Sequence, residues 1–328
     1  MELLDGRLEL TQRLGAGAFG EAWRAREVGS GAEAVVKLLH ARHAGDAHLL
    51  ERFRREVRAL EELSHPHVVP LLGSGVDSAR GPYYAMAWIP GRELRDVLEE
   101  AGALSLERAL RLSLQLLSAL ACAHERGILH RDLKPENALV ARPGQPDEHL
   151  YLIDFGLAKL SQGGARTIES LTQGNVLGTP LYMSPEQCTG QAAEPRSDVY
   201  AVGCLLLELL SGAPPFTLEP GASPVTLLAQ HVLEEPPRLE ERCPGAPAAL
   251  GPLLARCLAK EPEARPSAAE LHAELAAIAG APALPQTASV PPTAAISSAS
   301  VPPTSAIPPA ASVPPTAAVP SVASVPPT

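Results

Sequence analysis

The first 90 residues contain short apolar runs that alternate with polar positions or are rich in β-branched side chains. Such runs predict strands, and they cover residues 8–14, 21–28, 34–39, 68–76 and 83–88. One helix with a single apolar stripe is predicted by apolar residues that recur at intervals of three and four: Leu50, Phe53, Val57, Leu60 and Leu63. Pro90 and Gly91 then break the pattern and indicate a hinge.

Helical patterns dominate after this hinge. The longest begins at Leu106 and ends at Gly127, a residue that suits a left-handed helix cap. Further helices are predicted at residues 198–210, 248–258 and 268–278, and a short strand at residues 150–153 leads into Asp154. The pattern therefore predicts an α+β protein with a small β-rich lobe carrying one main helix, a hinge, and a larger, mostly helical lobe.

The composition changes near residue 280. Residues 281–328 contain no Asp, Glu, Lys or Arg, and Ser-Val-Pro-Pro-Thr recurs from Ser289, Ser300, Ser312 and Ser324. Such a segment has little apolar bulk to bury, which predicts a disordered tail with some polyproline II character. We therefore expect a folded domain over residues 1–280, followed by a Pro-rich tail. This tail either docks a polyproline-reading partner or only serves as a spacer.

Charge and cysteine usage narrow the class of protein. The chain carries 27 Lys and Arg against 37 Asp and Glu, a formal net charge of −10, which argues against nucleic acid as a partner. The five cysteines show no CxxC spacing, which is typical of reduced thiols in a cytosolic protein. The apolar run at residues 201–207 is too short to span a bilayer. We therefore expect a cytoplasmic protein with no membrane segment in this chain.

Residues 15–20 read Gly-Ala-Gly-Ala-Phe-Gly and fit the GxGxxG pattern of nucleotide-binding loops, which alone is weak evidence. In a dinucleotide-binding domain these glycines open a helix, whereas here they join two predicted strands and Lys37 follows on a third. The dinucleotide interpretation therefore fails. Taken singly, Lys37 is an ordinary strand-end lysine and Glu56 a helix-surface carboxylate paired with Arg52. Together they gain meaning, because a lysine that holds phosphate oxygens needs a carboxylate to orient it.

Residues 130–137 read His-Arg-Asp-Leu-Lys-Pro-Glu-Asn. Phosphoryl transfer requires a carboxylate to accept the proton of the attacking hydroxyl, oxygen ligands for Mg²⁺, and cations for the charge of the transferred group. Asp132 fits the first role, Asn137 with Asp154 the second, and Lys134 with Lys37 the third. The alternative is a charged surface loop followed by a chance Asp-Phe-Gly.

These motifs, in this order, resemble a eukaryotic-type protein kinase domain over residues 8–279. Lys134 and the sequence Gly-Thr-Pro-Leu-Tyr-Met-Ser-Pro-Glu at residues 178–186 resemble the serine/threonine kinases, most of all bacterial ones. The resemblance implies a two-lobed fold, with an N-lobe over residues 1–86, a hinge over 87–91 and a C-lobe over 92–280. It also implies transfer of the γ-phosphoryl group of ATP, with Mg²⁺, to Ser and Thr hydroxyls of protein substrates.

The resemblance further implies roles for individual residues. It assigns phosphate contacts to Gly15, Gly17, Gly20 and Lys37, orientation of Lys37 to Glu56, catalysis to Asp132 with Lys134, and Mg²⁺ binding to Asn137 and Asp154. It assigns supporting roles to His130, which packs within the catalytic loop, to Asp198, which holds that loop, and to the pair Glu186 and Arg265.

Two positions depart from the usual family pattern around the adenine. The family usually places Val two residues after the last loop glycine and Ala two residues before the lysine, whereas this chain has Ala22 and Val35. The exchange keeps the summed volume, so we expect an intact but reshaped roof over the adenine. The other implied adenine contacts are Leu14, Met86, Ala87, Ile89 and Leu139.

Arg131, directly before Asp132, suggests regulation. An arginine there is costly unless an anion satisfies it, and the following loop offers three hydroxyls, on Thr167, Ser170 and Thr172. The resemblance favours autophosphorylation of Thr172, with Arg131 and Lys159 as the cations that order its phosphate. The alternative is that these hydroxyls only keep the loop soluble.

A catalytically silent, kinase-like scaffold is the alternative function. It would act through nucleotide binding and the Pro-rich tail. Such a protein is expected to lack at least one of Lys37, Asp132, Asn137 and Asp154, and all four are present. The sequence therefore favours an enzyme.

Overall fold

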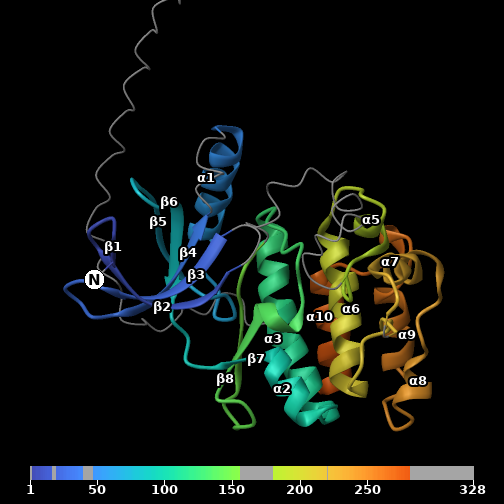
Figure 1. Cartoon of the computed structure of the whole chain (residues 1–328). Helices are drawn as coiled ribbons and strands as arrows, with labels where there is room; N and C mark the ends of the chain where they lie inside the picture. The colour runs from blue at the N-terminus through green and yellow to red at the C-terminus, as the bar shows by residue number, and fades with distance from the viewer. Residues whose placement is uncertain (1, 17–19, 40–46, 156–179, 220, 281–328) are drawn as a thin grey trace, which may run out of the picture. The chain divides into compact units, whose positions relative to one another are not determined.

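The computed structural model describes residues 2–16, 20–39, 47–155, 180–219 and 221–280. Within them, the N-terminal lobe is a six-stranded antiparallel sheet of order β1-β2-β3-β4-β6-β5 (Figure 1). The strands are β1 (Glu2–Leu4), β2 (Leu8–Ala16), β3 (Gly20–Glu27), β4 (Glu33–Leu39), β5 (Leu71–Asp77) and β6 (Gly81–Ala87). Helix α1 (Ala47–Glu61) follows β4 and packs Phe53 and Val57 against Tyr84 of the sheet.

The C-terminal lobe is mostly helical and carries a small second sheet of order β7-β8-β9 in the described residues. Its strands are β7 (Arg92–Glu93), β8 (Ala138–Ala141) and β9 (His149–Leu152). Its α-helices are α2 (Leu94–Ala101), α3 (Leu106–Glu125), α5 (Pro185–Cys188), α6 (Pro195–Ser211), α7 (Pro224–Leu233), α8 (Leu239–Arg242), α9 (Leu250–Cys257) and α10 (Ala268–Ala279). The described part of this lobe also contains the 3₁₀ turns η2 (Pro135–Asn137) and η4 (Pro262–Ala264).

Local chemistry fixes the ends of the longest helix. The Ser105 hydroxyl accepts a hydrogen bond from the Arg108 amide (3.4 Å) at the start of α3. Gly127 follows its last turn with a φ of 70°, a left-handed conformation that glycine adopts without steric cost. The predicted cap at this glycine is therefore confirmed.

Helix α6 forms the centre of the C-terminal lobe. All residues from 197 to 210 are buried, and the helix packs against α3 and α9. A helix that is apolar all round is typical of a core position, which explains the apolar run at residues 201–207. The polar Asp198, in its first turn, is therefore held by a rigid element.

The segment before β5 joins the two lobes. The Val69 amide donates to the Leu152 carbonyl (3.0 Å), and the Leu152 amide donates to the His67 carbonyl (2.9 Å). These bonds fix β9 against the N-terminal lobe. Asp154, two residues beyond β9, is thereby brought within reach of β4.

Most elements agree with the sequence pattern. The strand predicted at residues 68–76 begins at Leu71, because Val68 forms only an isolated bridge with Leu152. The pattern did not predict α2 and α7, which are eight and ten residues long, too short for their apolar periodicity to identify a helix.

The sequence also led to expectations about the tail, the cysteines and membrane-spanning helices. The predicted tail, residues 281–328, lies outside the described residues. All five cysteines lie within them and are free thiols. Among the described helices, none is long and apolar enough to span a membrane.

Candidate active site

Lys37 and Asp154 meet between the two lobes. Strand β4 carries Lys37, and its ammonium group forms an ion pair with Oδ2 of Asp154. Asp154 has a φ of 62°, a left-handed conformation that is uncommon outside glycine and clusters at functional sites. Its Oδ1 is buried and has no hydrogen-bond partner among the described residues. This oxygen thus makes no hydrogen bond with a described protein donor, although the Tyr84 hydroxyl lies near the carboxylate.

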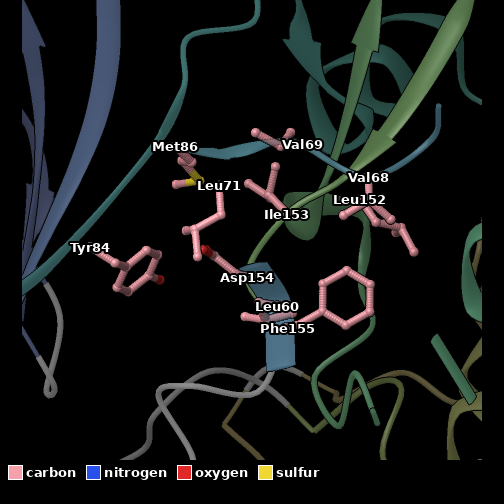
Figure 2. A pocket seen from close by; sticks show the side chains of 10 residues that line it. All are labelled: Leu60, Val68, Val69, Leu71, Tyr84, Met86, Leu152, Ile153, Asp154 and Phe155. Atoms are coloured by element: carbon pink, nitrogen blue, oxygen red, sulfur yellow. The ribbon is translucent and has the colours of Figure 1, made fainter. Parts of the chain in front are cut away.

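Tyr84 is the other polar neighbour of Asp154. Burial, and then the adjacent Asp154 carboxylate, raise the pKa of Tyr84 far above its ordinary value, so the phenol stays protonated. Tyr84 and Asp154 lie in one small pocket with Leu71, Met86 and Ile153 (Figure 2). In Figure 2 the side chains from the first sheet face those that follow β9. Asp154 is the only charged residue among the described side chains that line this pocket.

The loop from His130 to Asn137 presents Asp132. The Asn137 amide nitrogen donates to the Asp132 carbonyl (2.7 Å) and to its Oδ2 (3.1 Å), and Lys134 Nζ lies 3.0 Å from the same Oδ2. The Asn137 side-chain oxygen stays available as an acceptor, because the amide nitrogen makes both bonds. The Ile153 amide donates to the Asn137 carbonyl (3.0 Å), which ties this loop to the Asp154 turn. Asp132, Asn137 and Asp154 therefore belong to one site.

Asp198 holds this loop. Its Oδ2 accepts from the His130 amide (2.9 Å) and its Oδ1 from the Arg131 amide (2.8 Å), and His124 Nε2 lies 2.8 Å from Oδ2. Burial alone would raise the pKa of Asp198, but the bonds with His124 and His130 lower it below its ordinary value. Asp198 therefore stays ionised. These contacts fix Arg131 in a left-handed conformation with a φ of 63°.

His130 packs and hydrogen-bonds within the loop. It is fully buried, its Nε2 lies 3.0 Å from the Ile153 carbonyl oxygen, and its ring centroid lies 4.9 Å from that of Phe155. Burial lowers the pKa of His130, which keeps the ring neutral. These contacts support the structural role that the sequence suggested.

The ion pair expected between Lys37 and Glu56 is not formed. Lys37 binds Asp154 instead, and Glu56 Oε1 accepts from Arg131 Nη1 (3.2 Å). The turn after β9 puts Asp154 next to Lys37, and the attraction between opposite charges is strong at such short range. Within the described residues, a carboxylate of α1 thus contacts Arg131. The loop phosphate that the sequence suggested as its partner stays a prediction. Lys159, Thr167, Ser170 and Thr172 lie outside the described residues.

Three of the expected adenine contacts, Ala22, Val35 and Met86, share one face of the first sheet. Ala22 on β3 pairs with Lys37 on β4. Two residues farther along β3, Arg24 pairs with Val35, which lies two residues before Lys37 on β4. Residues two apart share a face, so Ala22, Val35 and Lys37 point to the same side. Val35 and Ile89 pack against a buried cluster that includes Met86 and Ala87. Leu139 on β8 pairs with Tyr151, whose side chain joins the same cluster.

The glycine-rich segment is partly described. Leu14 is exposed, Gly15 pairs with Ala22, and Gly17 lies outside the described residues. A Cβ on Gly20 would lie 1.8 Å from the Leu38 carbonyl oxygen, so only glycine allows β3 to approach β4 there. Gly20 thus serves strand pairing, a role the motif did not suggest.

Residues 180–188 form a segment beside the catalytic loop. Arg265 binds Glu186 through two parallel bonds, Nη1 to Oε1 (2.8 Å) and Nη2 to Oε2 (2.9 Å), and both side chains are buried. Gln187 Nε2 donates to the Arg131 carbonyl (3.0 Å). The bidentate pair between Glu186 and Arg265 predicted from the sequence is confirmed.

The arrangement can be compared with known proteins. A family model for the protein kinase domain matches residues 8–275. This chain belongs to the protein kinase family. Serine/threonine-protein kinase pkn3 of Myxococcus xanthus is 38% identical to this kinase chain over 269 residues, which cover 81% of the chain and 48% of pkn3. Serine/threonine-protein kinase PknB of Mycobacterium tuberculosis is 36% identical over 276 residues, which cover 83% of the chain and 43% of PknB.

A solved kinase structure shows the same fold. The PknI kinase domain of Mycobacterium tuberculosis superposes with a TM-score of 0.62 at 26% identity, covering 83% of this chain and 96% of that domain. Two-lobed architecture is therefore common to both. The present chain spans less than half the length of the two curated kinases, 48% and 43%.

Sequence reasoning missed several residues of this kinase site. Arg95 on α2 donates from Nη1 to Glu208 (2.9 Å), from Nη2 to the Tyr182 hydroxyl (2.7 Å) and from Nε to Glu136 (3.3 Å). It therefore links the catalytic loop to residues 180–188. No local signal marks Arg95, because its partners are 41 to 113 positions away in sequence. Tyr84 was missed for the same reason.

Proposed function

We propose that this chain is the catalytic domain of a serine/threonine protein kinase that transfers the γ-phosphoryl group of ATP to protein hydroxyls. The observation that carries the proposal is the meeting of Lys37, Asp132, Asn137 and Asp154 in one site, from three different segments: β4, the loop of residues 130–137 and the turn after β9. Lys134 and residues 178–186 support Ser and Thr as acceptors. The curated relatives bear serine/threonine kinase names.

Asp132 is positioned to accept the proton of the attacking hydroxyl. Asn137 orients its carboxylate, and Lys134 places a positive charge 3.0 Å from it. Lys134 is also close enough to stabilise negative charge on the transferred group. Lys37 supplies a second cation from the roof of the site.

The donor set fits Mg²⁺. Mg²⁺ prefers hard oxygen ligands, and the site offers the unpartnered buried Oδ1 of Asp154 and the side-chain oxygen of Asn137. When bound, Mg²⁺ neutralises charge on the β- and γ-phosphates of ATP. The adenine would lie between Ala22 and Val35 above and Leu139 below, with Met86 behind and the backbone of Ala87 and Ile89 at the hinge.

Regulation is proposed to run through Arg131. A phosphate on Thr172, or on Ser170 or Thr167, would compete with Glu56 for the Arg131 guanidinium, with Lys159 as a second cation. A Glu56 released in this way can then orient Lys37, the pairing that the family resemblance implies.

Location and partners complete the proposal. Five free thiols support a cytoplasmic location for the domain. Its substrates are proteins that present Ser or Thr, and the Pro-rich residues 281–328 are a candidate docking segment for a polyproline-reading partner.

Labelled ATP tests the function directly. The purified chain is incubated with labelled ATP and Mg²⁺ beside Asp132→Asn, and phosphorylated residues are mapped by mass spectrometry. We expect Ser and Thr labelling by the wild type and a loss of at least about a hundredfold in the variant. Nucleotide binding without any labelling would instead identify a silent scaffold.

A further inference from the structure

Arg24 is a charged residue on the face of the first sheet that carries the proposed adenine contacts, and the chemistry proposed above does not use it. Ala22 precedes it by two residues on β3 and therefore points to the same face. Arg24 pairs with Val35 on β4, and Val35 pairs with Met86 on β6. Arg24 thus shares a row of the sheet with two of the proposed adenine contacts and lies beside a third.

Two neighbours hold the Arg24 guanidinium. Its central carbon lies over the Trp88 ring, 4.4 Å from the ring centre, and its Nη2 donates to Glu33 Oε1 (2.7 Å). A planar guanidinium can stack on an aromatic face and bind a carboxylate with its edge at the same time. The Trp88 amide also donates to the Glu33 carbonyl (3.4 Å). The three residues therefore form a closed set of contacts.

The contact between Arg24 and Trp88 passes over β4. Within the described strands, β3 is hydrogen-bonded to β4 and β4 to β6, so the sheet itself connects β3 to β6 only indirectly. Trp88 directly follows β6 and stands between Ala87 and Ile89, the two residues whose backbone is proposed to bind adenine. Arg24 therefore links the strand that carries Ala22 directly to the hinge.

We propose that Arg24 is a positioning residue for the purine base of the nucleotide. By stacking on Trp88 it fixes the separation between β3 and the hinge, and so holds open a slot of constant width for the base. A base that contacts the roof and the hinge together loses one of the two contacts when this separation changes, and a slot held in advance lowers the cost of binding. The inference rests on the proposed nucleotide site.

An ordinary surface ion pair is the alternative role. The Arg24 and Glu33 side chains are 33% and 39% exposed, and pairs of this kind contribute little to stability. In that case the loss of Arg24 would leave nucleotide affinity unchanged. The chain offers a matched control, because the guanidinium carbon of Arg80 lies 5.6 Å from the centre of the Trp23 ring. Trp23 precedes Arg24 on β3 and therefore points to the opposite face of the sheet.

Calorimetric titration with two ligands, adenosine and a non-hydrolysable ATP analogue, tests the proposal. Arg24→Met keeps the length of the side chain and removes the guanidinium, and Trp88→Leu removes the ring. We expect the Kd to rise about three- to tenfold in each variant. The factor should be the same for both ligands, because adenosine has no phosphate. The double variant should lose no more than the weaker-binding single variant, and Arg80→Met should bind both ligands as the wild type does.

Steady-state kinetics with myelin basic protein as acceptor give a second readout. In Arg24→Met the KM for ATP should rise by the factor found for the Kd, while kcat and the KM for the acceptor stay unchanged, as expected when uniform binding is lost. Because Trp88 is partly buried, Arg24→Met decides alone if Trp88→Leu does not fold.

Three outcomes would overturn the proposal. These are an unchanged Kd for adenosine in Arg24→Met, a double variant that loses the full sum of the two single effects, and a wild-type chain that binds no adenosine. A wild-type chain that binds adenosine but transfers no phosphate would refute the kinase function instead. The calorimetric comparison would then still decide whether Arg24 positions the base.

Discussion

At the scale of single residues, burial decides what an ion pair contributes. Arg265 and Glu186 are both buried and also bind neighbouring groups, the guanidinium through the Ala259, Lys260 and Arg196 carbonyls and the carboxylate through Ser197. Burial alone would raise the pKa of Glu186, but the bonds from Arg265 and Ser197 lower it, so the carboxylate is ionised. Removing one partner therefore leaves an uncompensated buried charge.

Arg265→Leu is expected to lower the free energy of unfolding by about 3–5 kcal/mol. Urea titration of the purified chain measures this change. Arg256→Leu is the matched control, because the pair of Arg256 with Glu274 is about half exposed (48% and 44%) and should contribute less than about 1 kcal/mol. Similar losses in both variants would contradict the argument from burial.

Gly15 and Gly20 of the glycine-rich segment differ in how much space surrounds them. A Cβ on Gly20 would overlap the Leu38 carbonyl, whereas a Cβ on Gly15 meets nothing within 4 Å. We expect Gly20→Ala to destabilise the chain by roughly 1–3 kcal/mol and Gly15→Ala by less than about 0.5 kcal/mol. Thermal unfolding of the two variants under one condition tests this. Equal melting temperatures would mean that β3 and β4 adjust without cost.

At the scale of elements, strand register brings together the residues of the proposed adenine roof. Ala22 and Lys37 are paired across neighbouring strands and so point to the same face of the sheet. Val35 points to that face as well, because it lies two residues from Lys37 on the same strand. Val35 already packs against the cluster around Met86 and Ala87. Extra volume at position 22 therefore enters a space that the Val35 side chain partly fills.

Ala22→Val alone should weaken ATP binding by about 1–2 kcal/mol, roughly five- to thirtyfold, through overpacking. The double exchange Ala22→Val with Val35→Ala should regain most of the loss. Calorimetric titration with a non-hydrolysable ATP analogue completes the double-mutant cycle with Val35→Ala alone. Additive free energies would show that the two side chains do not compensate each other.

Part of the fold and of the candidate site could be predicted from the sequence. Residues 8–39 and helix α3 were predicted because their apolar periods are long enough to read. The motif residues Asp132, Asn137 and Asp154 were found because each stands in a recognisable local pattern. The predicted ion pair of Lys37 with Glu56 was wrong. Lys37 and Asp154 are 117 positions apart in sequence, and only distances in the folded chain show which of the two carboxylates contacts the lysine. The roles of Arg95 and Tyr84 were missed because they depend on the same long-range contacts.

At the scale of the whole molecule, histidines join the lobes. His65 Nε2 lies 3.0 Å from the Ser118 hydroxyl on α3, and the His67 and His149 ring centroids are 4.3 Å apart. Burial lowers the pKa of His65 and of His67 to about 4, with Arg126 and His149 adding to the effect. Unfolded histidine titrates near 6.5, so the unfolded chain takes up protons first as the pH falls.

Stability should therefore be complete above about pH 6.5 and decline as the pH falls toward 4. Between pH 7 and pH 5.5 we expect these two histidines to contribute a loss of roughly 1–2 kcal/mol in the free energy of unfolding, a value reduced for the partial exposure of both rings. His130 and His231, whose pKa values burial also lowers, add to the loss in the same direction. Urea titrations at the two pH values measure it. His67→Asn keeps a donor for the Leu150 carbonyl but cannot titrate, so its pH dependence should be shallower. An unchanged dependence in that variant would place the proton uptake elsewhere.

The buried helix α6 has a consequence for how such a domain can be altered. It supplies Asp198 to the catalytic loop, Glu208 to Arg95, Ser197 to Glu186 and Tyr200 to His231. A helix without a solvent face cannot rotate or shift its register without emptying and refilling the core around it. The groups that contact α6 must then keep fixed positions relative to one another. Changes meant to alter the site should therefore be made in the residues that α6 contacts, such as Arg95, and not in the residues of α6 itself.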